Sequence, residues 1–415
     1  MTTHPRHSEP SLRDGEESQP LTGERSLPEG WRWAKLGDVS TAIRGITFQS
    51  GEAKQKPFDD SIACLTTSGV QDEVNWESRR FIPRRRIPSD KQLLEPGDLL
   101  VSTANSKELV GKSCLVTNPP FVCTFGAFVT VLRPKAETVP RILAYWMRTQ
   151  EAMGYCYQVA SNTTNISNLR VSDLLDMRIA LPPLPEQRRI AAILQDQLAA
   201  VERARAAAEE QLTAAEALPA AYLRAVFNSP EAQQWPQKPF GSLADNLDGR
   251  RIPLKQEERR VRKGQYPYYG ASGVIDSIDD YLFDGEYLLV SEDGANLVLR
   301  STPIAFKATG KFWVNNHAHV VQPRNGVLLD YLLHFLNRTD LKLYISGMAQ
   351  PKLTQDDLNS IPVPVPPIAE QQQVVATLSE QMAAAEQARI ALQAQLDAIS
   401  RLPASLLRRA FKGEL

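Results

Sequence analysis

The heptapeptide Leu181-Pro182-Pro183-Leu184-Pro185-Glu186-Gln187 recurs 184 residues later as Val365-Pro366-Pro367-Ile368-Ala369-Glu370-Gln371. The same offset holds without a gap from Leu169 upstream of the first copy to Phe227 downstream of it. A repeat of this length indicates a duplicated architecture, in which one structural unit occurs twice along the chain.

Each copy of the repeat predicts a long helix that begins at its proline-rich segment. Glu186 and Glu370 fall in the first turn, where the helix dipole favours acidic side chains. An apolar seam follows, with the alternating spacings of four and three residues that are typical of a coiled coil. The seam consists of Leu194, Leu198, Val201, Arg205, Ala208, Leu212 and Ala215 in the first copy, and of Leu378, Met382, Ala385, Arg389, Leu392, Leu396 and Ile399 in the second.

The matching seams predict that the two helices pack on each other. Each would have about 33 residues and a length of roughly 50 Å. Arg205 and Arg389 occupy the same seam position, and a polar residue there can fix the register of a coiled coil. The alternative is a pair of separate amphipathic surface helices.

The segments before each helix are also related, more weakly. Pro96–Ser102 resembles Asp284–Ser291, and both have the pattern of a turn that enters a buried strand. Expected strands are Leu99–Thr103, Val129–Arg133, Tyr287–Ser291 and Val314–Val321, and expected helices are Pro140–Gln150 and Leu328–Asn337. This mixture predicts two α+β domains, each followed by a long helix. The expected organisation is a disordered tail at 1–26, a domain at 27–180, a helix at 181–230, a domain at 231–364 and a helix at 365–415.

Composition limits the other possibilities. The chain has 415 residues, enough for two domains, and a formal net charge of −1. No apolar run approaches the roughly 20 residues that span a bilayer, and the polar N-terminus lacks a signal-peptide core. The four cysteines are not spaced as zinc pairs. These features predict a cytoplasmic protein that has no metal site, no disulfide framework and no membrane partner.

At this point the chain, from Leu27 onward, resembles the specificity subunits of type I restriction–modification enzymes. The resemblance is carried by both copies of the heptapeptide, by Arg409–Leu415, and by two segments that look like target-recognition segments, Tyr268–Gly273 and Trp313–His319. It implies that each globular domain is a target-recognition domain that reads one half of a split double-stranded DNA site. It also implies that the two helices form an antiparallel coiled coil that separates the domains.

The same resemblance implies a role in a restriction system and in DNA modification without catalysis by this chain. The helices would dock adenine methyltransferase subunits, and restriction subunits with ATP-driven motors would join the complex. S-adenosylmethionine, ATP and magnesium would then be bound by those partners, and this chain would bind no cofactor.

Charge is distributed unevenly, in a way that suits contacts to DNA phosphates. Arginines cluster around Phe81-Ile82-Pro83, basic residues dominate 250–263, and no acidic residue occurs between 300 and 324. The cations that we single out as DNA-binding candidates are Arg79, Arg80, Arg84, Arg85, Arg86, Arg250, Arg251, Arg300, Lys307 and Lys311. Candidates for reading bases, whose edges match polar side chains, are Asn105, Ser106, Lys107, Tyr268, Tyr269, Ser272, Asn315, Asn316, His317, Gln350 and Lys352. Each of these could instead cap a turn or satisfy a buried backbone group.

Three features point to other functions. Asn118-Pro119-Pro120-Phe121 matches the tetrapeptide with which amino-methyltransferases hold a flipped adenine, but no glycine-rich cofactor turn precedes it, and its expected counterpart, 301–304, lacks the motif. His317 and His319, expected on one face of a strand, suggest a metal site without a third ligand. Glu292-Asp293-Gly294 suggests a magnesium site, although a tight turn explains it as well. A coiled-coil scaffold that does not bind DNA remains a further alternative, against which the basic clusters argue.

Overall fold

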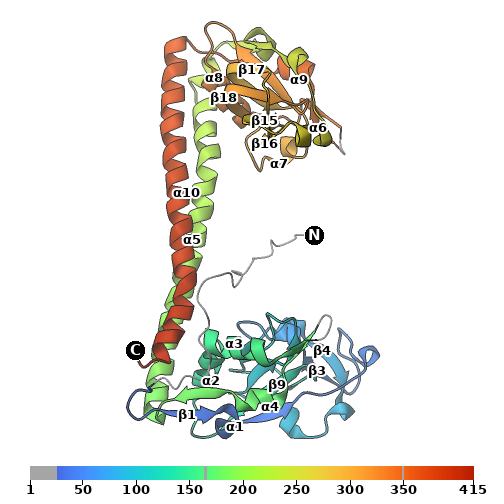
Figure 1. Ribbon diagram of the computed structural model, residues 1–415, viewed down its shortest axis with the longest axis vertical. Helices are drawn as coiled ribbons and strands as arrows, with labels where there is room; N and C mark the ends of the chain where they lie inside the picture. Colours follow the sequence, from blue (N-terminus) through green and yellow to red (C-terminus); the bar gives the residue numbers. More distant parts are fainter. Residues whose placement is uncertain (1–25, 163–165, 348–349) are drawn as a thin grey trace. The chain divides into compact units, whose positions relative to one another are not determined.

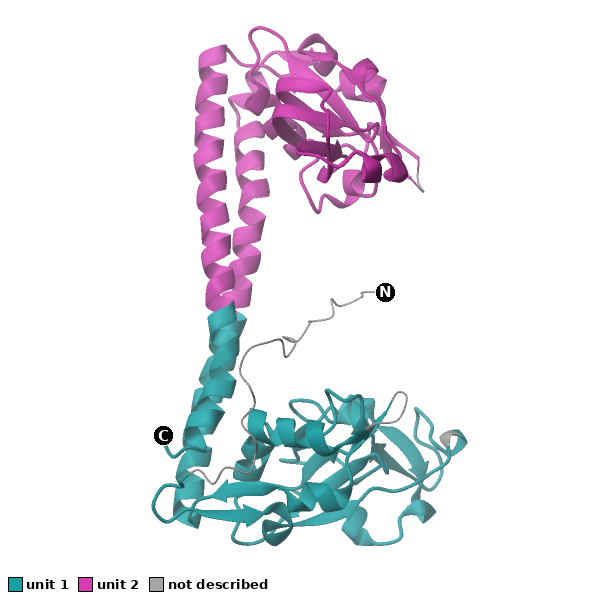
Figure 2. Ribbon diagram, in the orientation of Figure 1, with its two compact units in different colours: residues 1–206, 397–415 teal, residues 207–396 magenta. Residues whose placement is uncertain are grey.

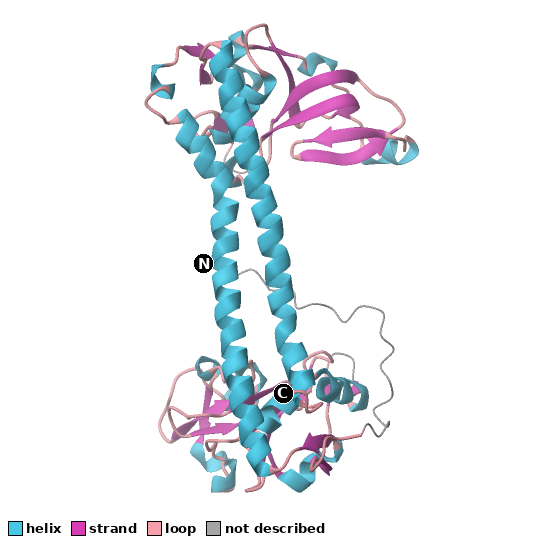
Figure 3. Ribbon diagram, turned by 90° about the vertical axis from the view of Figure 1, so that its left-hand side faces the viewer, coloured by secondary structure: helices cyan, strands magenta, loops and turns pink. Residues whose placement is uncertain are grey.

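The computed structural model describes residues 26–162, 166–347 and 350–415. The tail expected at 1–26 lies outside the described residues except for Ser26. The chain divides into two compact units (Figure 2), of which unit 1 comprises 1–206 and 397–415 and unit 2 comprises 207–396. Figure 3 shows that both units combine helices with strands, so the expected α+β class is confirmed.

Unit 1 is built from short sheets. The central sheet has the order β2-β9-β5-β7, a second sheet has the order β4-β3-β8, and smaller ones have the orders β10-β11-β6 and β1-β12. The strands are β1 Arg32–Lys35, β2 Ser40–Arg44, β3 Ser61–Leu65, β4 Arg80–Pro83, β5 Leu99–Ser102, β6 Ala104–Asn105, β7 Ser113–Leu115, β8 Cys123–Phe125, β9 Val129–Pro134, β10 Ser161–Asn162, β11 Ser167–Asn168 and β12 Arg178–Leu181. The helices are α1 Leu36–Val39, α2 Pro140–Met147, α3 Gln150–Val159 and α4 Val171–Asp176.

Sequence explains several of these elements. Strand β5 is apolar at three successive positions because all four of its residues are buried, which suits a strand covered on both faces. Pro140 occupies the first turn of α2, where its missing N–H costs nothing. Thr149 ends the expected helix 140–150 early, because its hydroxyl accepts the Ala152 N–H and caps the new helix α3.

Unit 2 has a corresponding arrangement of strands, in which one six-stranded sheet takes the place of the two larger sheets of unit 1. Its main sheet has the order β14-β19-β17-β18-β15-β16, and smaller sheets pair β13 with β22 and β20 with β21. The strands are β13 Gln237–Pro239, β14 Ala244–Asn246, β15 Tyr266–Gly270, β16 Gly273–Ile278, β17 Phe283–Ser291, β18 Ala305–Val314, β19 Ala318–Pro323, β20 Ile345–Ser346, β21 Lys352–Leu353 and β22 Pro362–Pro364. The helices are α6 Gln256–Val261, α7 Asn296–Leu299, α8 Leu329–Arg338 and α9 Gln355–Ser360.

The strand expected at Val314–Val321 is wrong in one respect. It is two strands, β18 and β19, separated by a turn at 315–317. The turn forms because the Asn315 side-chain oxygen accepts the His317 N–H at 2.8 Å, a local bond that competes with the sheet ladder. His317 therefore lies outside the strand that contains His319, and the two imidazoles do not share a strand face.

The long helices are α5, Leu184–Phe227, and α10, Ile368–Ala410, with 44 and 43 residues. They pack antiparallel, as expected (Figure 1). Both are longer than the 33 residues that we expected, because each continues through a proline, Pro219 or Pro403. The seam residues buried in the structure are Leu194, Val201, Ala208, Ala215, Leu378, Ala385 and Ile399, and those half-buried are Leu198, Leu212, Met382, Leu392 and Leu396.

The two seam arginines keep their guanidinium groups at the edge of the seam. The Arg205 side chain is 44% exposed and lies beside Glu202, and the Arg389 side chain is 40% exposed and bonds Glu386 twice at 2.8 Å. The hydrogen bond with Glu386 raises the pKa of Arg389, and the carboxylates of Glu386 and Glu216 add to the effect. Glu216 belongs to α5, so this charge contact between helices supports a fixed register.

The downstream end of each long helix completes a domain core. Leu223 and Phe227 of α5 are buried among Tyr331 and Phe335 of α8, with ring centroids 5.6 Å apart. In unit 1 the equivalent Phe411, directly after the end of α10, packs on a tryptophan of α2, Trp146, with centroids 5.0 Å apart. Each core therefore includes residues from both of the long helices.

The glutamine that ends each heptapeptide has the same structural role in both units. Gln187 is buried; its side-chain oxygen accepts the Val139 N–H at 2.8 Å, and its amide donates to the Glu137 and Pro182 carbonyls. Gln371 makes the same three bonds in unit 2, to the N–H before α8 and to the carbonyls of Gly326 and Pro366. Each glutamine thereby fixes the start of a long helix to the loop that begins α2 or α8.

Candidate nucleic-acid interface

Four segments of unit 2 converge at one end of its sheet. They are residues 271–273, 292–294, 315–317 and 350–352, which we call loop edge 2. Backbone bonds join them: Asn315 N–H donates to Tyr269 O at 3.1 Å, Glu292 N–H to His317 O at 2.9 Å, and Leu353 N–H to Glu292 O at 2.8 Å. This frame positions whatever side chains the segments carry.

Unit 1 has the same frame. Its loop edge 1 comprises residues 66–68, 103–107, 126–128 and 166–168. Gly126 N–H donates to Leu65 O at 2.8 Å, Thr103 N–H to Phe128 O at 2.9 Å, and Leu169 N–H to Thr103 O at 2.8 Å. These three bonds are the counterparts of the three in unit 2, and they equate Phe128 with His317, and Thr103 with Glu292. The residues that follow, Ala104 and Asp293, are therefore equivalent too.

Several candidates from the sequence meet at these edges. Loop edge 2 holds Ser272, Asn316, His317, Gln350 and Lys352, all of them exposed. Loop edge 1 holds Asn105, Ser106 and Lys107, with the Lys107 ammonium 4.2 Å from the centroid of the Tyr157 ring. Polar side chains on surface loops held by a rigid frame are suited to reading base edges.

Three other candidates are buried or half-buried. Tyr268 is fully buried and its hydroxyl accepts the Leu254 N–H at 3.0 Å; Tyr269 is half-buried and stacks on Phe306; Asn315 is buried in its turn. Tyr268 and Asn315 cannot reach DNA in this conformation, because each is surrounded by its own domain. Pattern alone did not separate them from their exposed neighbours, since alternation along β15 depends on a bulge between Tyr268 and Tyr269.

Two residues at the edges were not among the DNA-binding candidates, although Asp293 was considered as part of a possible magnesium site. Phe128 is 60% exposed in the turn before β9, and Asp293 is the partner of His317. In the sequence, the only hint for Phe128 was its position directly after two small residues, Gly126 and Ala127. Only the pairing of the strands shows that Phe128 and His317 occupy equivalent positions.

The arginine cluster of unit 1 is partly used inside the domain. Arg79 donates to the Trp76 carbonyl at 2.9 Å and stacks on Phe121, and Arg86 bonds Glu52 at 2.7 Å, with Arg85 4.0 Å away from that acid. The hydrogen bond with Arg86, helped by the Gln49 N–H, lowers the pKa of Glu52. Arg80 and Arg84 are exposed, and neither side chain forms an ion pair with a described residue.

More of the basic candidates in unit 2 than in unit 1 form ion pairs or hydrogen bonds within their own domain. Arg251 lies in a charge network described below; Arg300 donates to the Thr339 carbonyl; and Lys307 lies between Glu286 and Asp330, at 3.1 and 2.7 Å. Burial lowers the pKa of Arg300. The charged groups of these three residues are therefore already bound by partners within unit 2. Arg250 stacks on Phe283 and Lys311 lies over Tyr281, which leaves their charges nearer to the surface.

Acids also neutralise the basic stretch 250–263. Arg259 and Lys263 both bond Asp276, and Arg262 bonds Asp279 at 3.0 Å. The hydrogen bond with Lys263, with further bonds from Ser277 and Arg259, lowers the pKa of Asp276 to about 2. Seven basic residues in sequence therefore present much less free positive charge than their number indicates.

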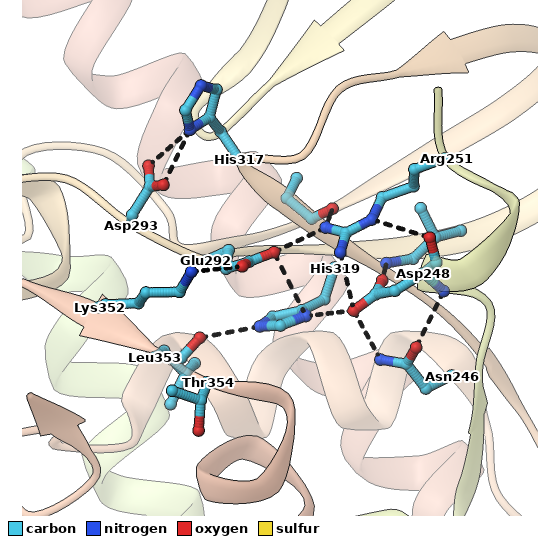
Figure 4. Close-up of polar contacts among 12 residues, drawn as sticks. Asn246, Asp248, Arg251, Glu292, Asp293, His317, His319, Lys352, Leu353 and Thr354 are labelled. Carbon is cyan, nitrogen blue, oxygen red and sulfur yellow. Dashed lines mark hydrogen bonds and ion pairs between the residues drawn. The ribbon is translucent and has the colours of Figure 1, made fainter. Parts of the chain in front are cut away.

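A buried charge network lies under loop edge 2 (Figure 4). His319 is 1% exposed; its Nδ1 lies 2.6 Å from Asp248 and its Nε2 lies 2.9 Å from the Leu353 carbonyl. Arg251 bonds Glu292 at 2.6 Å and lies 3.3 Å from Asp248. Lys352 reaches Glu292 at 3.1 Å. The network ties β19, β21 and the end of β17 together.

Ligand atoms of Asp248, Glu292 and His319 lie within 4.8 Å of one another, as in a metal site. Arg251 contacts both acids, so a dication there would lie beside a guanidinium and would compete with two existing ion pairs. We interpret the cluster as an ion-pair network, which also accounts for Glu292-Asp293-Gly294. Burial tends to raise the pKa of Glu292, but Arg251 and Lys352 hold it below its usual value.

The methyltransferase-like tetrapeptide forms the loop between β7 and β8. Its Phe121 packs edge-on against Trp76, with centroids 5.6 Å apart, and beneath Arg79. The counterpart that we expected at 301–304 is wrong. Val101 and Val290 are equivalent, since each precedes the equivalent pair Thr103 and Glu292 by two residues. Val101 pairs with Ser113 and Val290 pairs with Ala305, so Ser113 corresponds to Ala305. The tetrapeptide therefore corresponds to the middle of β18, near Gly310.

No helix within the described ranges combines the length and the apolar character that a membrane span requires. The four cysteines are buried and free. Burial raises the pKa of the Cys114, Cys123 and Cys156 thiols to about 12, which keeps them protonated and unreactive.

Comparison with known proteins gives one consistent result. A family model described as type I restriction modification DNA specificity domain matches residues 28–211 and 233–394. The StySPI type I restriction enzyme specificity subunit of Salmonella potsdam is 24% identical over 94% of this chain and 90% of its own length. The EcoKI specificity subunit of Escherichia coli K12 is 23% identical, with the same coverage of 94% and 90%.

Two solved structures share the fold. A chain from a structure concerned with complex assembly of the type I restriction–modification system has a TM-score of 0.72, with 21% identity over 94% of this chain and all of that one. The HsdS subunit of Thermoanaerobacter tengcongensis has a TM-score of 0.65, with 20% identity over 95% and 99%.

Proposed function

The chain belongs to the family of type I restriction–modification DNA specificity proteins, and from that premise we propose that its two units read the two halves of a split double-stranded DNA site. Residues 27–180 and 231–364 would be the two target-recognition domains, and 181–230 and 365–415 the helical segments. A specificity subunit carries no catalysis, which lies in other subunits of the complex.

One observation carries this proposal. The two loop edges share their backbone bonds but differ in their side chains: Phe128 corresponds to His317, and Ala104 to Asp293. A constant frame with variable side chains is suited to reading different base sequences with one fold. We therefore expect two different half-sites, read by loop edges 1 and 2, with phosphate contacts from the free cations.

The complex would be completed by partners. The matched relatives are specificity subunits of type I restriction enzymes, so we expect adenine methyltransferase subunits and restriction subunits to dock on this chain. They would bring S-adenosylmethionine, ATP and magnesium. Such complexes act on DNA in the cytoplasm, where we place this protein.

The test is methylation mapping in a host that lacks adenine methylation. The host expresses this chain alone, its neighbouring methyltransferase alone, or both. We expect methylation only with both, at a motif of two unlike half-sites separated by a fixed gap of unspecified bases. Methylation by this chain alone would show that it is a catalyst, and two identical half-sites would contradict the assignment of different readers.

The free arginines of unit 1 give a first prediction. Replacing Arg80 and Arg84 together by Ala should weaken DNA binding by about tenfold at low salt and reduce the salt slope by roughly 1–2. Sequence preference should stay the same, because phosphate contacts carry no base information. The measurement is binding of the complex to its mapped site across a salt series.

The matched control is Arg86→Ala, which removes a cation from the same segment that already bonds Glu52. It should change the salt slope by less than half as much. Equal slopes for the double variant and the wild type would show that this cluster does not contact DNA.

A further inference from the structure

His317 and Asp293 form a pair at the surface of loop edge 2 (Figure 4). The imidazole Nδ1 lies 3.0 and 2.8 Å from the two carboxylate oxygens of Asp293. The His317 side chain is 46% exposed and that of Asp293 is 17% exposed. No described residue bonds Nε2 of His317, so the pair leaves one ring nitrogen available at the surface.

The backbone holds both members of the pair. The His317 N–H donates to the Asn315 side chain at 2.8 Å, and the His317 carbonyl accepts the Glu292 N–H at 2.9 Å. Asp293 forms an antiparallel bridge with Lys352, and the next N–H, of Gly294, donates to the Pro351 carbonyl. The buried network around His319 supports this frame from below. The ring is therefore pre-positioned, as a base-reading side chain must be.

The carboxylate determines what the exposed nitrogen can do. An ionised Asp293 can only accept, so Nδ1 carries the hydrogen of the neutral ring, and Nε2 is an acceptor. In the major groove, adenine N6 and cytosine N4 present amino donors, whereas guanine O6 and thymine O4 present acceptors at the corresponding positions. An acceptor fixed in place favours the amino-bearing bases and is repelled by the others.

We propose that His317, oriented by Asp293, determines one position of the half-site read by unit 2 by accepting a hydrogen bond from the amino group of adenine or cytosine. The proposal rests on the proposed function, since it requires that loop edge 2 faces the major groove. His317 would contact the base, and Asp293 would be a positioning residue that fixes its tautomer.

Unit 1 supplies the contrasting case. At the equivalent position it has Phe128, and Ala104 replaces the carboxylate. An apolar ring offers no hydrogen bond and can contact only apolar features such as the thymine methyl group. His317→Phe therefore places the residue of one loop edge on the other, and keeps an aromatic ring there while removing both ring nitrogens.

The test uses the full chain with its methyltransferase and the motif found by mapping. Binding and methylation are measured for duplexes that carry each of the four base pairs at each position of both half-sites, at about pH 8.5, where an ordinary imidazole is neutral. We expect one position at which the wild type favours adenine or cytosine. His317→Phe should reduce that preference by about tenfold or more and leave the other half-site unchanged.

Asp293→Asn tests the tautomer. An amide can turn either its oxygen or its nitrogen toward Nδ1, so Nε2 becomes able to donate as well as accept. We expect amino-bearing and carbonyl-bearing bases to be bound within about threefold of each other at that position, a relaxation that loss of folding would not produce. The control is Asp280→Asn, which also removes one acid from unit 2 but only at an exposed ion pair with Arg262; it should keep the wild-type preference.

The outcomes separate the two proposals. Unchanged base preferences in both His317→Phe and Asp293→Asn, with or without a uniform loss of affinity, would overturn the role of His317 while the mapped motif stands. Absence of any split motif in the wild-type complex would remove the proposed function, and this inference with it.

Discussion

Replacing Phe411 by Ala should destabilise unit 1 by about 3–5 kcal/mol, the usual cost of removing a fully buried phenylalanine. The side chain is 2% exposed and packs on Trp146 with a centroid distance of 5.0 Å. Its loss opens a cavity where α10 meets α2, in a cluster that also contains Leu407 and Ala410. The damage should therefore be local to unit 1.

Hydrogen exchange of the full chain measures this effect by region. Amides of α2 should lose protection, whereas those of α8 in unit 2 should keep it, because their core contains Phe227 instead. Leu402→Ala is the control, since Leu402 is 44% exposed on the same helix and its loss should cost less than about 0.5 kcal/mol. Equal protection of α2 in wild type and Phe411→Ala would show that α10 contributes little to this core.

The second large effect is expected from Asp248. Replacing it by Leu removes the carboxylate that bonds His319 at 2.6 Å and lies 3.3 Å from Arg251. His319 is buried, with its side chain 1% exposed, and the Arg251 side chain is only 13% exposed. The substitution leaves Arg251 and His319 with Glu292 but without their second acid, and removing one member of a buried ion pair costs about 3–5 kcal/mol. Chemical unfolding, followed with probes in unit 2, measures it.

The cost should depend on pH. Burial tends to raise the pKa of Asp248, but hydrogen bonds from His319, the Val320 N–H and Asn246 hold it below its usual 3.8. A carboxyl whose folded pKa lies below its unfolded one stabilises the fold above the unfolded value, and this contribution disappears as pH falls through the folded value. The stability difference between wild type and Asp248→Leu should thus be full at neutral pH and shrink below about pH 4.

Asp245→Asn is the matched control, because Asp245 lies only three residues before Asp248, in β14, but its side chain is 57% exposed in an ion pair with Arg324. It should change stability by less than about 1 kcal/mol. If Asp248→Leu were no less stable than this control, the network would be replaceable by apolar packing, as happens for some buried ion pairs.

The sequence was sufficient for the repeat, the coiled coil and the α+β class, because a gapless offset of 184 residues and two matching seams leave few alternatives. It was insufficient for helix length. We expected about 33 residues, yet α5 and α10 continue through Pro219 and Pro403, because Leu223, Phe227, Leu407 and Phe411 find buried partners beyond the prolines. Tertiary packing overrides a local helix breaker in both copies.

Candidate residues were predictable in part. Loop positions such as Asn316 and Lys352 could be selected by type, whereas Tyr268 and Asn315 could not be recognised as interior from pattern alone. Phe128 and Asp293 needed the strand register, which only three-dimensional pairing supplies. Arg251 and Lys307 show a further limit, since a run of cations in sequence gives no information about acids that fold against it.

Each domain core contains residues from both long helices, and this has a consequence for synthesis on the ribosome. Domain 2 is translated after Leu223 and Phe227, and its core is complete once Leu378, near the start of α10, has followed. Domain 1 needs Leu407 and Phe411, which follow Trp146 by roughly 260 residues; at about 5–20 residues per second that is about 13–52 s. During this interval the nascent chain lacks the residues that cover Trp146, so we expect domain 1 to expose apolar surface for longer than domain 2 does.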